Sequence, residues 1–396
     1  MSNFSGYQWY AIDPVDAWFF RDGKPFNRGE DQGDSRSLFP PLPTATVGTI
    51  RYALAIENGW DGRSNWKDVA VPSLPGKTFG DVIGPSHSQT GQLSFAGPLV
   101  CRNNLPLFTM PRHVLGHKTV REDRENGIQS GEGCFAKEFK PEDFLAPIPN
   151  DTTESDLGRL LLPAPKNRSA HGQKAPESAG DFFITQAGML KVVEGSLPSE
   201  TDCIDANDLL VMESRVGIAR NLVQRSVVDG MLYSPHYVRP RDRGARTGLM
   251  VGVDGAPWDL PKLIAFGGEA RMSGTEKVAP LDLTVNNAKL TQHIALVLLT
   301  PALFGKPWWG AGPGENAIQL DPQLSGRIES VAMDRPQRIG GWNSIDSVPF
   351  AKRPAVAAGS VWWIELTGQG LLPGTLIRIG QEQHLGFGLA VVVAAP

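Results

Sequence analysis

Alternating apolar and polar residues near the start of the chain predict a β-strand followed by one helix. The segment QWYAID, residues 8–13, alternates and is rich in aromatic residues, as half-buried strands are. In the later segment FPPLPTATVGTIRYALAIENG, the prolines stop before Thr44, and Thr44 or Thr46 is expected to cap a helix. Apolar residues then recur at helical spacing, at Val47, Ile50 and Leu54. Gly59 is expected to end this helix.

Strand-like runs dominate the rest of the chain. They include GQLSFAGPLVC, NLPLFTM and LLVMESRVGIA. The segment MLYSPHYVRPRDRGARTGLMVGV resembles a strand pair joined by an arginine-rich loop. Residues 150–180 are polar and rich in proline, which predicts a surface insertion within a loop-rich region at about 112–180.

Two segments of the chain resemble each other, which predicts an internal repeat. LIAFGGEARMSG begins at Leu263 and LIRIGQEQHLGFG begins at Leu376, an offset of 376 − 263 = 113 residues. The same offset places LMVGV, residues 249–253, on WWIEL, residues 362–366. Each copy is expected to end in a strand, a short helix, a glycine loop and a last strand. A βαββαβ ferredoxin-like unit fits this order, with one copy in residues 1–284, including long insertions, and the other in residues 285–396.

Composition limits the class of protein. The chain has 396 residues, with 44 glycines and 32 prolines, against about 28 and 20 at average usage. This composition favours short strands and ordered loops over a helical bundle. Hydrophobic residues make up 41% of the chain, which is too many for a disordered protein.

Charge and cysteine usage exclude several other classes. The net charge is −4 and the isoelectric point is near 6.0, which argues against a free-standing nucleic-acid binder but allows local basic patches. The three cysteines contain no CxxC pair, so neither a zinc ribbon nor a disulfide framework is expected. No secretory signal and no apolar run of membrane-spanning length are present in the sequence. We therefore expect a cytoplasmic protein without a membrane span.

Eight motifs in order along the chain carry a family resemblance. They are DPVDAWFFRDGKPF, FPPLPTATVGTIR, ESRVGIARN, GMLYSPHYVRP, FGGEAR, GGWN, AAGSVWW and HLGFGLA. Between about Trp9 and Val393, the chain resembles the third Cmr subunit of type III-B CRISPR effector complexes, which belongs to the RAMP superfamily. The first glycine loop, GGEARMSG, departs from the family pattern because it lacks the tight GFG of the last one.

The resemblance implies a fold, a function and partners. The implied fold is α+β, with two ferredoxin-like (RRM-like) domains, glycine-rich loops and long insertions. The implied role is a non-catalytic one, in which the chain helps hold the 5′ tag of the CRISPR RNA. The implied partners are that RNA, the large polymerase-like Cas subunit and a backbone RAMP subunit. No catalytic residue, metal or cofactor is implied.

The two glycine loops are the first candidate RNA-binding elements. Consecutive backbone N–H groups in such loops can cradle a phosphate, and Arg271 and His384, at equivalent positions of the repeat, can add a charge-assisted contact. The alternative is a tight turn that lets the last strand enter its sheet. The glycines concerned are Gly267, Gly268, Gly386 and Gly388.

The arginine-rich loop YVRPRDRGARTG is the second candidate. Arginine forks suit phosphate oxygens, and the nearby tyrosines, Tyr233 and Tyr237, could stack on unpaired bases. The alternatives are a solvated hairpin tip and a contact with an acidic neighbouring subunit. The arginines concerned are Arg239, Arg241, Arg243 and Arg246.

Three further cations are candidate RNA contacts. Arg21 and Lys24 lie in a turn-forming loop after the first strand, where Asp22 could instead neutralise Arg21. Arg51 lies on the rim of the apolar stripe of the predicted helix, so it must either be paired or reach a ligand groove.

Histidines support a competing enzymatic hypothesis. His113 and His117 have a spacing of four residues, but Gly116 weakens a helix there and no third metal ligand is evident. A histidine pair could also serve acid–base cleavage of RNA. The alternative function is therefore a RAMP-type, metal-independent endoribonuclease that processes CRISPR repeat RNA, with His113, His117 or His236 as candidate groups. A purely structural subunit is a third possibility.

Overall fold

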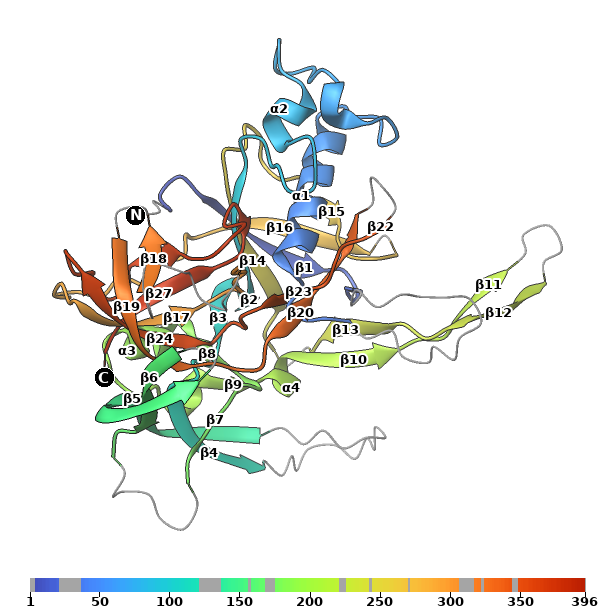
Figure 1. Cartoon of the computed structure of the whole chain (residues 1–396). Helices are drawn as coiled ribbons and strands as arrows, with labels where there is room; N and C mark the ends of the chain where they lie inside the picture. The colour runs from blue at the N-terminus through green and yellow to red at the C-terminus, as the bar shows by residue number, and fades with distance from the viewer. Residues whose placement is uncertain are drawn as a thin grey trace.

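The computed structural model has a strand-rich α+β fold with few helices, as the sequence predicts (Figure 1). It describes residues 4–20, 37–120, 137–155, 158–167, 175–220, 226–241, 244–269, 271–305, 317–321, 324–343 and 348–395. Two large sheets form the body. Within the described part of the chain, no helix is both long and apolar enough to cross a membrane.

The first sheet combines strands from most of the first 280 residues. Its order is β15-β16-β1-β14-β2-β3-β8-β9, and each neighbouring pair is antiparallel. The bounds are β15 Leu263–Ala265, β16 Met272–Val278, β1 Gln8–Pro14, β14 Thr247–Asp254, β2 Ser94–Arg102, β3 Leu105–Thr109, β8 Phe182–Thr185 and β9 Cys203–Asp205.

The second sheet is built from the last hundred residues. Its order is β18-β19-β24-β17-β27-β25, again antiparallel throughout. The bounds are β18 Ala317–Asp321, β19 Leu324–Ala332, β24 Val361–Thr367, β17 His293–Leu298, β27 Leu389–Ala394 and β25 Leu376–Arg378.

The sequence repeat corresponds to a repeat of strand order. The run β15-β16-β1-β14-β2 in the first sheet matches β25-β27-β17-β24-β19 in the second, and each set follows the same order along the chain. β15 and β25 begin at Leu263 and Leu376, the two residues that open the repeat. The short helix expected before each glycine loop is wrong, because residues 255–262 and 368–375 contain turns and bends but no helix.

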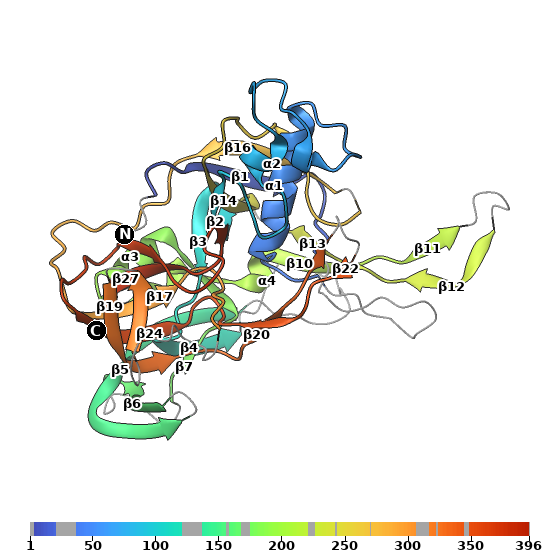
Figure 2. The same ribbon diagram turned by 45° about the horizontal axis from the view of Figure 1, so that its top comes forward.

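Helix α1, Pro43–Glu57, covers the first sheet on the side away from the second sheet (Figures 1 and 2). Its apolar stripe shares a core with strand residues such as Tyr10 and Phe95. The predicted helix is confirmed, but the predicted cap is wrong. The helix begins one residue before Thr44, and Leu42 at the N-cap makes no side-chain hydrogen bond. Proline at the first position removes one of the amides that a cap would satisfy.

The two sheets share a core. Trp9 and Met250 of the first sheet pack in one cluster with Val297, Trp363 and Val391 of the second. The short strand β26, Leu385–Gly386, also pairs in parallel with the start of β2. The C-terminal segment is therefore part of both halves.

Buried Arg378 holds the two halves together at this point. It lies at the end of β25 and is 8% exposed. Its guanidinium donates hydrogen bonds to Tyr7 Oη at 2.6 Å, to the Phe95 carbonyl at 2.8 Å and to Ser94 Oγ at 3.0 Å. Burial lowers the pKa of Arg378. Such a charge-assisted set is costly to leave unpaired, so these contacts fix the second half on the first.

The expected loop-rich insertion is wrong in the part of it that the structure describes. That part forms a separate sheet in the order β6-β5-β4-β7. Proline and polar residues suggested loops, but prolines are tolerated at sheet edges and bulges, and the β5–β6 pairing is irregular between Pro147 and Thr152. The bounds are β4 Val114–Val120, β5 Lys137–Ser155, β6 Gly158–Pro165 and β7 Glu177–Ser178.

The expected pairing across the arginine-rich loop is also wrong. β13, His236–Pro240, pairs with β10, Leu210–Ser214, whereas β14 pairs with β1 and β2. The loop therefore connects two different sheets. Beyond β10 and β13, the hairpin of β11, Gly217–Arg220, and β12, Val227–Tyr233, projects from the body as an arm (Figures 1 and 2).

Short elements complete the described fold. They are α2 Phe79–Ile83, α3 Gln186–Val193, α4 Ala206–Leu209, β20 Gln337–Ile339, β21 Trp342–Asn343, β22 Val348–Pro349 and β23 Arg353–Ala355.

Candidate nucleic-acid interface

The predicted RNA-binding residues do not gather at one site. Arg21, Lys24 and Arg243 lie outside the described residues. The others divide between two glycine loops, helix α1 and the strands around β13.

The last glycine loop is closed to a ligand. Gly386 and Gly388 are buried, with φ of 96° and 70°. A Cβ at Gly386 would lie 2.2 Å from the Gly97 carbonyl oxygen, and one at Gly388 would lie 1.8 Å from that of Ile379. Their N–H groups donate within the protein, to Gln383 and Pro301 carbonyls at 3.0 and 2.9 Å. The geometry favours the tight-turn alternative over a phosphate cradle.

His384, just before this loop, contacts a carbonyl group of the protein. Its Nε2 lies 2.8 Å from the Ser88 carbonyl oxygen. The expected equivalence with Arg271 therefore does not extend to their surroundings, since Arg271 lies among charged side chains.

The first glycine loop positions an aromatic residue. The Gly268 N–H donates to the Phe19 carbonyl at 2.7 Å, and a Cβ at Gly267, with φ of 92°, would lie 2.8 Å from the same oxygen. The Phe19 ring in turn packs against Tyr237, with centroids 5.4 Å apart. The Gly268 N–H already donates to a carbonyl within the protein and is not available to a phosphate. The loop therefore positions Phe19 by packing against it.

Arg51 is paired inside the protein. It is 3% exposed and donates from Nη2 to the Gly84 carbonyl at 2.7 Å. Its guanidinium carbon lies 5.2 Å from the ring centre of Trp66, and burial lowers the pKa of Arg51 to about 10. Of the two possibilities for this residue, pairing is the one that the structure supports, and its burial argues against direct contact with RNA.

Two arginines of the predicted loop have separate partners. Arg241 donates from Nε to the Leu210 carbonyl at 3.2 Å. Arg246 contacts Asp13 and Glu276, each with a nitrogen–oxygen distance of 3.0 Å. Arg246 is more than half exposed and remains a candidate RNA contact.

The remaining arginines meet in one network, which we call the arginine cluster. It joins the bend after β1, the end of β10, strand β13 and the loop between β15 and β16. Its members are Asp16, Glu213, Arg215, Tyr237, Arg239, Glu269 and Arg271.

Three guanidinium groups of the arginine cluster converge on Asp16. Arg239 Nη1 lies 2.7 Å from Oδ1, while Arg215 Nη2 and Arg271 Nη1 lie 3.1 and 3.3 Å from Oδ2. Burial opposes ionisation of this carboxyl, but the hydrogen bonds from Arg215 and Arg239 outweigh it and lower the pKa of Asp16. The carboxylate is therefore firmly charged at neutral pH.

Two glutamates hold the other edges of these arginines. Glu213 accepts from Arg215 Nε at 2.6 Å and from Arg239 Nε. These two hydrogen bonds lower the pKa of Glu213. Glu269 accepts from the Tyr237 hydroxyl and lies 4.0 Å from Arg271 Nη2. The three arginines and three carboxylates have a formal charge sum of zero.

Tyr237 is the centre of the arginine cluster. The guanidinium carbons of Arg215 and Arg271 lie 4.6 and 4.4 Å from its ring centre, within the range of cation–π contact. The residue is 2% exposed. Since two guanidinium groups lie against the ring and the residue is buried, the ring face that base stacking would need is not open.

Four members of the cluster, Asp16, Glu213, Arg215 and Glu269, are not among the residues that the sequence predicts to bind RNA. All four lie within family motifs, which were the only signal: Asp16 in DPVDAWFFRDGKPF, Glu213 and Arg215 in ESRVGIARN, and Glu269 in FGGEAR. Val15 and Val216, beside them in the chain, are 70% and 72% exposed. The cluster thus lies at a surface with apolar neighbours.

The histidines do not form a catalytic pair. His113 is fully buried, stacks on Phe144 at 5.2 Å, and has no hydrogen-bond partner for either ring nitrogen among the described residues. Burial lowers the pKa of His113 to about 3, so the ring is neutral at physiological pH. His117 lies instead near Glu142, with a nitrogen–oxygen distance of 3.3 Å. In the described part of the chain, no group of three or more potential ligands is placed to hold a metal ion.

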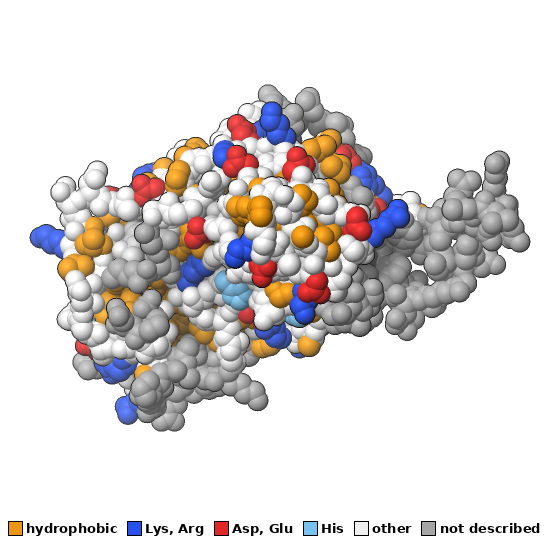
Figure 3. Space-filling model, turned by 90° about the horizontal axis from the view of Figure 1, so that it is seen from above, with side chains coloured by type: hydrophobic (Ala, Val, Ile, Leu, Met, Phe, Trp, Pro, Cys, Tyr) orange, Lys and Arg blue, Asp and Glu red, His pale blue; other side chains and the backbone are white. Residues whose placement is uncertain are grey.

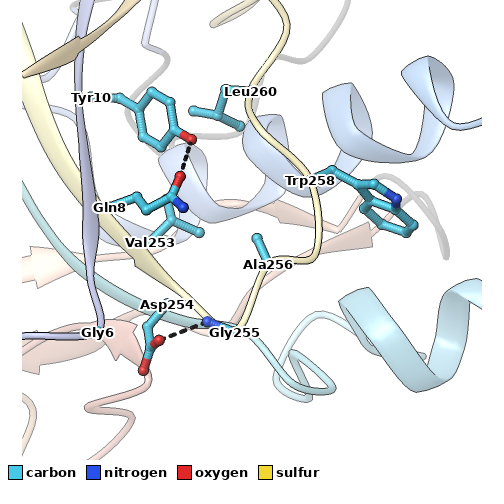
Figure 4. A pocket seen from close by; sticks show the side chains of 9 residues that line it. All are labelled: Gly6, Gln8, Tyr10, Val253, Asp254, Gly255, Ala256, Trp258 and Leu260. Atoms are coloured by element: carbon cyan, nitrogen blue, oxygen red, sulfur yellow. Dashed lines mark hydrogen bonds between the residues drawn. The ribbon is translucent and has the colours of Figure 1, made fainter.

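A cavity of about 140 Å³ lies elsewhere, where the central strands β1 and β14 of the first sheet begin and end, respectively (Figure 4). Within it, the Tyr10 hydroxyl donates to Gln8 at 2.9 Å, and the Gly255 N–H donates to Asp254 at 2.8 Å. The lining residues are Gly6, Gln8, Tyr10, Val253, Asp254, Gly255, Ala256, Trp258 and Leu260. The lining residues include no arginine or lysine, so the cavity does not suit a phosphate.

On the upper face, the described Lys and Arg side chains do not gather in a single basic patch (Figure 3). There, Lys and Arg side chains alternate with Asp and Glu side chains and with apolar areas (Figure 3). This agrees with the net charge of −4. Among the described residues, the arginine cluster is the local group of cations that we consider further.

Comparison with known proteins identifies the chain as a CRISPR-associated protein. It matches the family model described as "CRISPR-associated protein (Cas_Cmr3)" over residues 10–395. The chain belongs to this Cmr3 family, which confirms the resemblance carried by its motifs. No curated protein matches it.

Two solved structures contain similar chains. One is a cryo-EM structure of the Type III-B Cmr-beta bound to cognate target RNA and AMPPnP, state 1, with 14% identity and a TM-score of 0.42. The other is a cryo-EM structure of the Type III-B Cmr-beta bound to cognate target RNA, with 14% identity and a TM-score of 0.43. Each match covers 90% of this chain and 86% of the other chain.

Proposed function

We propose that this chain is a non-catalytic, RNA-binding subunit of a type III-B CRISPR effector complex that helps hold the 5′ tag of the CRISPR RNA. Its membership of the Cmr3 family over residues 10–395 is the observation that carries the proposal. The arginine cluster supplies the chemistry, because guanidinium groups bind phosphate oxygens through paired hydrogen bonds.

The proposed RNA-binding set is narrower than the one that the sequence predicts. It keeps the arginines that reach the surface near β13, and it adds Arg215. Arg51, Gly386 and Gly388 are left out because they are buried and engaged. The proposed residues are Arg215, Arg239, Arg241, Arg246 and Arg271, and we retain Arg21, Lys24 and Arg243 from the sequence alone.

We further propose that the two sheets derive from two ferredoxin-like domains, residues 1–284 and 285–396. In each sheet the first strand of the unit lies between the third and the fourth, as the runs β16-β1-β14-β2 and β27-β17-β24-β19 show. This is the order of a βαββαβ unit, in which a turn-rich segment replaces the second helix.

The proposed protein partners are the large polymerase-like Cas subunit and a backbone RAMP subunit, in the cytoplasm. The projecting β11–β12 arm supports this, because a hairpin that extends beyond the body suits contact with a neighbouring subunit (Figure 1). The mixed charge of the surface agrees with extensive protein contacts. The endoribonuclease alternative finds no support in His113, which is buried and neutral.

Purification of the tagged chain from its native host tests the proposal. We expect CRISPR RNA with an intact 5′ tag, together with the other Cmr subunits, to co-purify and to be identified by RNA sequencing and mass spectrometry. Recovery of the chain with the protein subunits but without CRISPR RNA in the particle would contradict the RNA-binding role. Recovery of the chain alone would contradict the assembly role.

A further inference from the structure

The arginine cluster already contains an anion in the position where a ligand would bind. Both carboxylate oxygens of Asp16 accept from terminal guanidinium nitrogens of three arginines, at 2.7–3.3 Å. A carboxylate has one charge shared by two oxygens, and so does a phosphodiester group with its two non-bridging oxygens. Arginine binds either group in the same geometry.

The arginines are held in place by groups other than Asp16. Glu213 engages the Nε edges of Arg215 and Arg239, which leaves their terminal nitrogens directed at Asp16. Arg271 rests against the ring of Tyr237, and its Nε has no acceptor among the described residues. If Asp16 moved away, the three groups would remain arranged for an anion.

Asp16 itself is weakly held. It lies in a bend after β1, and its side chain is 42% exposed. Solvent screens ion pairs at such exposure, which weakens each of them. A short side chain also has two torsions about which it can turn toward solvent.

We propose that Asp16 is a built-in substitute for an RNA phosphodiester, and that the RNA backbone displaces it from Arg215, Arg239 and Arg271. This rests on the proposed RNA-binding function and adds a mechanism to it. In the free chain, Asp16 neutralises the site and prevents unspecific association with other anions. When the correct strand is placed by other contacts, its phosphodiester takes over the three guanidinium groups, and Asp16 turns to solvent.

The direction in which one substitution changes the affinity for RNA tests this inference. The assay measures binding of the full chain to a labelled single-stranded RNA that carries the 5′ tag, by fluorescence anisotropy. Asp16→Asn is expected to tighten RNA binding about threefold to tenfold. The reason is that the carboxylate that competes with the RNA phosphate for the three guanidinium groups is then neutral. Asp16→Ala is expected to act in the same direction, whereas Asp16→Glu, which keeps the charge, is not.

A charge-matched control separates the local effect from net charge. Glu365 pairs with Arg327 at 3.0 Å in the second sheet, and both are exposed. Glu365→Gln changes the net charge by the same amount as Asp16→Asn but is expected to leave the affinity nearly unchanged. Salt titration gives a second readout. The slope of log K against log salt is expected to be steeper for Asp16→Asn than for the wild type, because in the wild type the freed Asp16 carboxylate takes up cations and offsets part of the counterion release.

The outcomes distinguish this inference from the proposed function. If Arg239→Ala weakens RNA binding while Asp16→Asn weakens it or leaves it unchanged, the site binds RNA but Asp16 is not a competitor, and the inference fails alone. If neither substitution changes RNA binding, the proposed function of this site fails as well. If Asp16→Asn strengthens binding of polyglutamate but not of RNA, the ligand is an acidic protein segment, and the inference is overturned.

Discussion

Replacing Gly388 with alanine is expected to destabilise the protein by about 3–5 kcal/mol, or to prevent folding. The position requires φ of 70°, and an added Cβ would lie 1.8 Å from the Ile379 carbonyl oxygen. That carbonyl belongs to backbone next to β25, and the Ile379 N–H itself donates to the Gly388 carbonyl at 2.9 Å. Relief of the clash would therefore separate β25 from β27, the strand pair at one edge of the second sheet. Urea denaturation followed by circular dichroism measures the change.

Gly48 provides the matched control for this prediction. It lies within α1, is exposed, and has nothing within 4 Å of an added Cβ. Gly48→Ala is expected to stabilise the protein by about 0.5–1 kcal/mol, because alanine is the better helix former. A Gly388→Ala protein with an unchanged urea midpoint would show that this bend tolerates a side chain.

Simultaneous replacement of Arg215, Arg239 and Arg271 with alanine is expected to weaken binding of the 5′ tag about 30-fold to 100-fold. The expected loss combines three charge-assisted hydrogen bonds to phosphate, and it is increased because Asp16 and Glu213 then remain as unpaired anions that repel RNA. The salt dependence of binding is expected to become smaller, because fewer phosphates are contacted. Anisotropy titrations at two salt concentrations measure both effects.

The control for the triple variant removes the same charge elsewhere. Arg63, Arg327 and Arg335 are exposed and lie outside the arginine cluster, and their joint replacement is expected to change the affinity less than threefold. Equal losses in the two triple variants would mean that only the net charge matters. Unchanged urea midpoints in both are needed to exclude unfolding as the cause.

The features that were predicted correctly from the sequence are those that depend on residues close together in the chain. Helix α1 follows from apolar spacing and from the prolines before it. Its C-terminal end was predicted within two residues, whereas its N-cap, Leu42, lies two and four residues before the predicted Thr44 and Thr46. The internal repeat was visible because β15 and β25 keep the same offset as β14 and β24 in the chain. The strands of the insertion were missed because proline and polar residues are equally typical of loops and of edge strands.

The arginine cluster could not be predicted from spacing. Arg215 and Arg271 are 199 and 255 residues from Asp16 in the chain. The pairing of β1 with β16 brings Arg271 beside Asp16, and the bridge between Trp18 and Val238, together with the pairing of β13 with β10, brings Arg215 there. The glycine loops show a different limit. In a sequence, a glycine that leaves room for a phosphate cannot be distinguished from a glycine that leaves room for a neighbouring backbone segment. At Gly386 and Gly388, the structure shows that the neighbour is backbone and that both residues are buried.

Mapping RNA–protein crosslinks in the assembled complex, by ultraviolet irradiation and mass spectrometry, tests the central claim most directly. We expect nucleotides of the 5′ tag to crosslink to this chain in residues 206–216, 234–241 or 263–275, which surround the arginine cluster. Crosslinks on this chain that occur only in the separate sheet of residues 137–167, or tag crosslinks confined to other subunits, would contradict it.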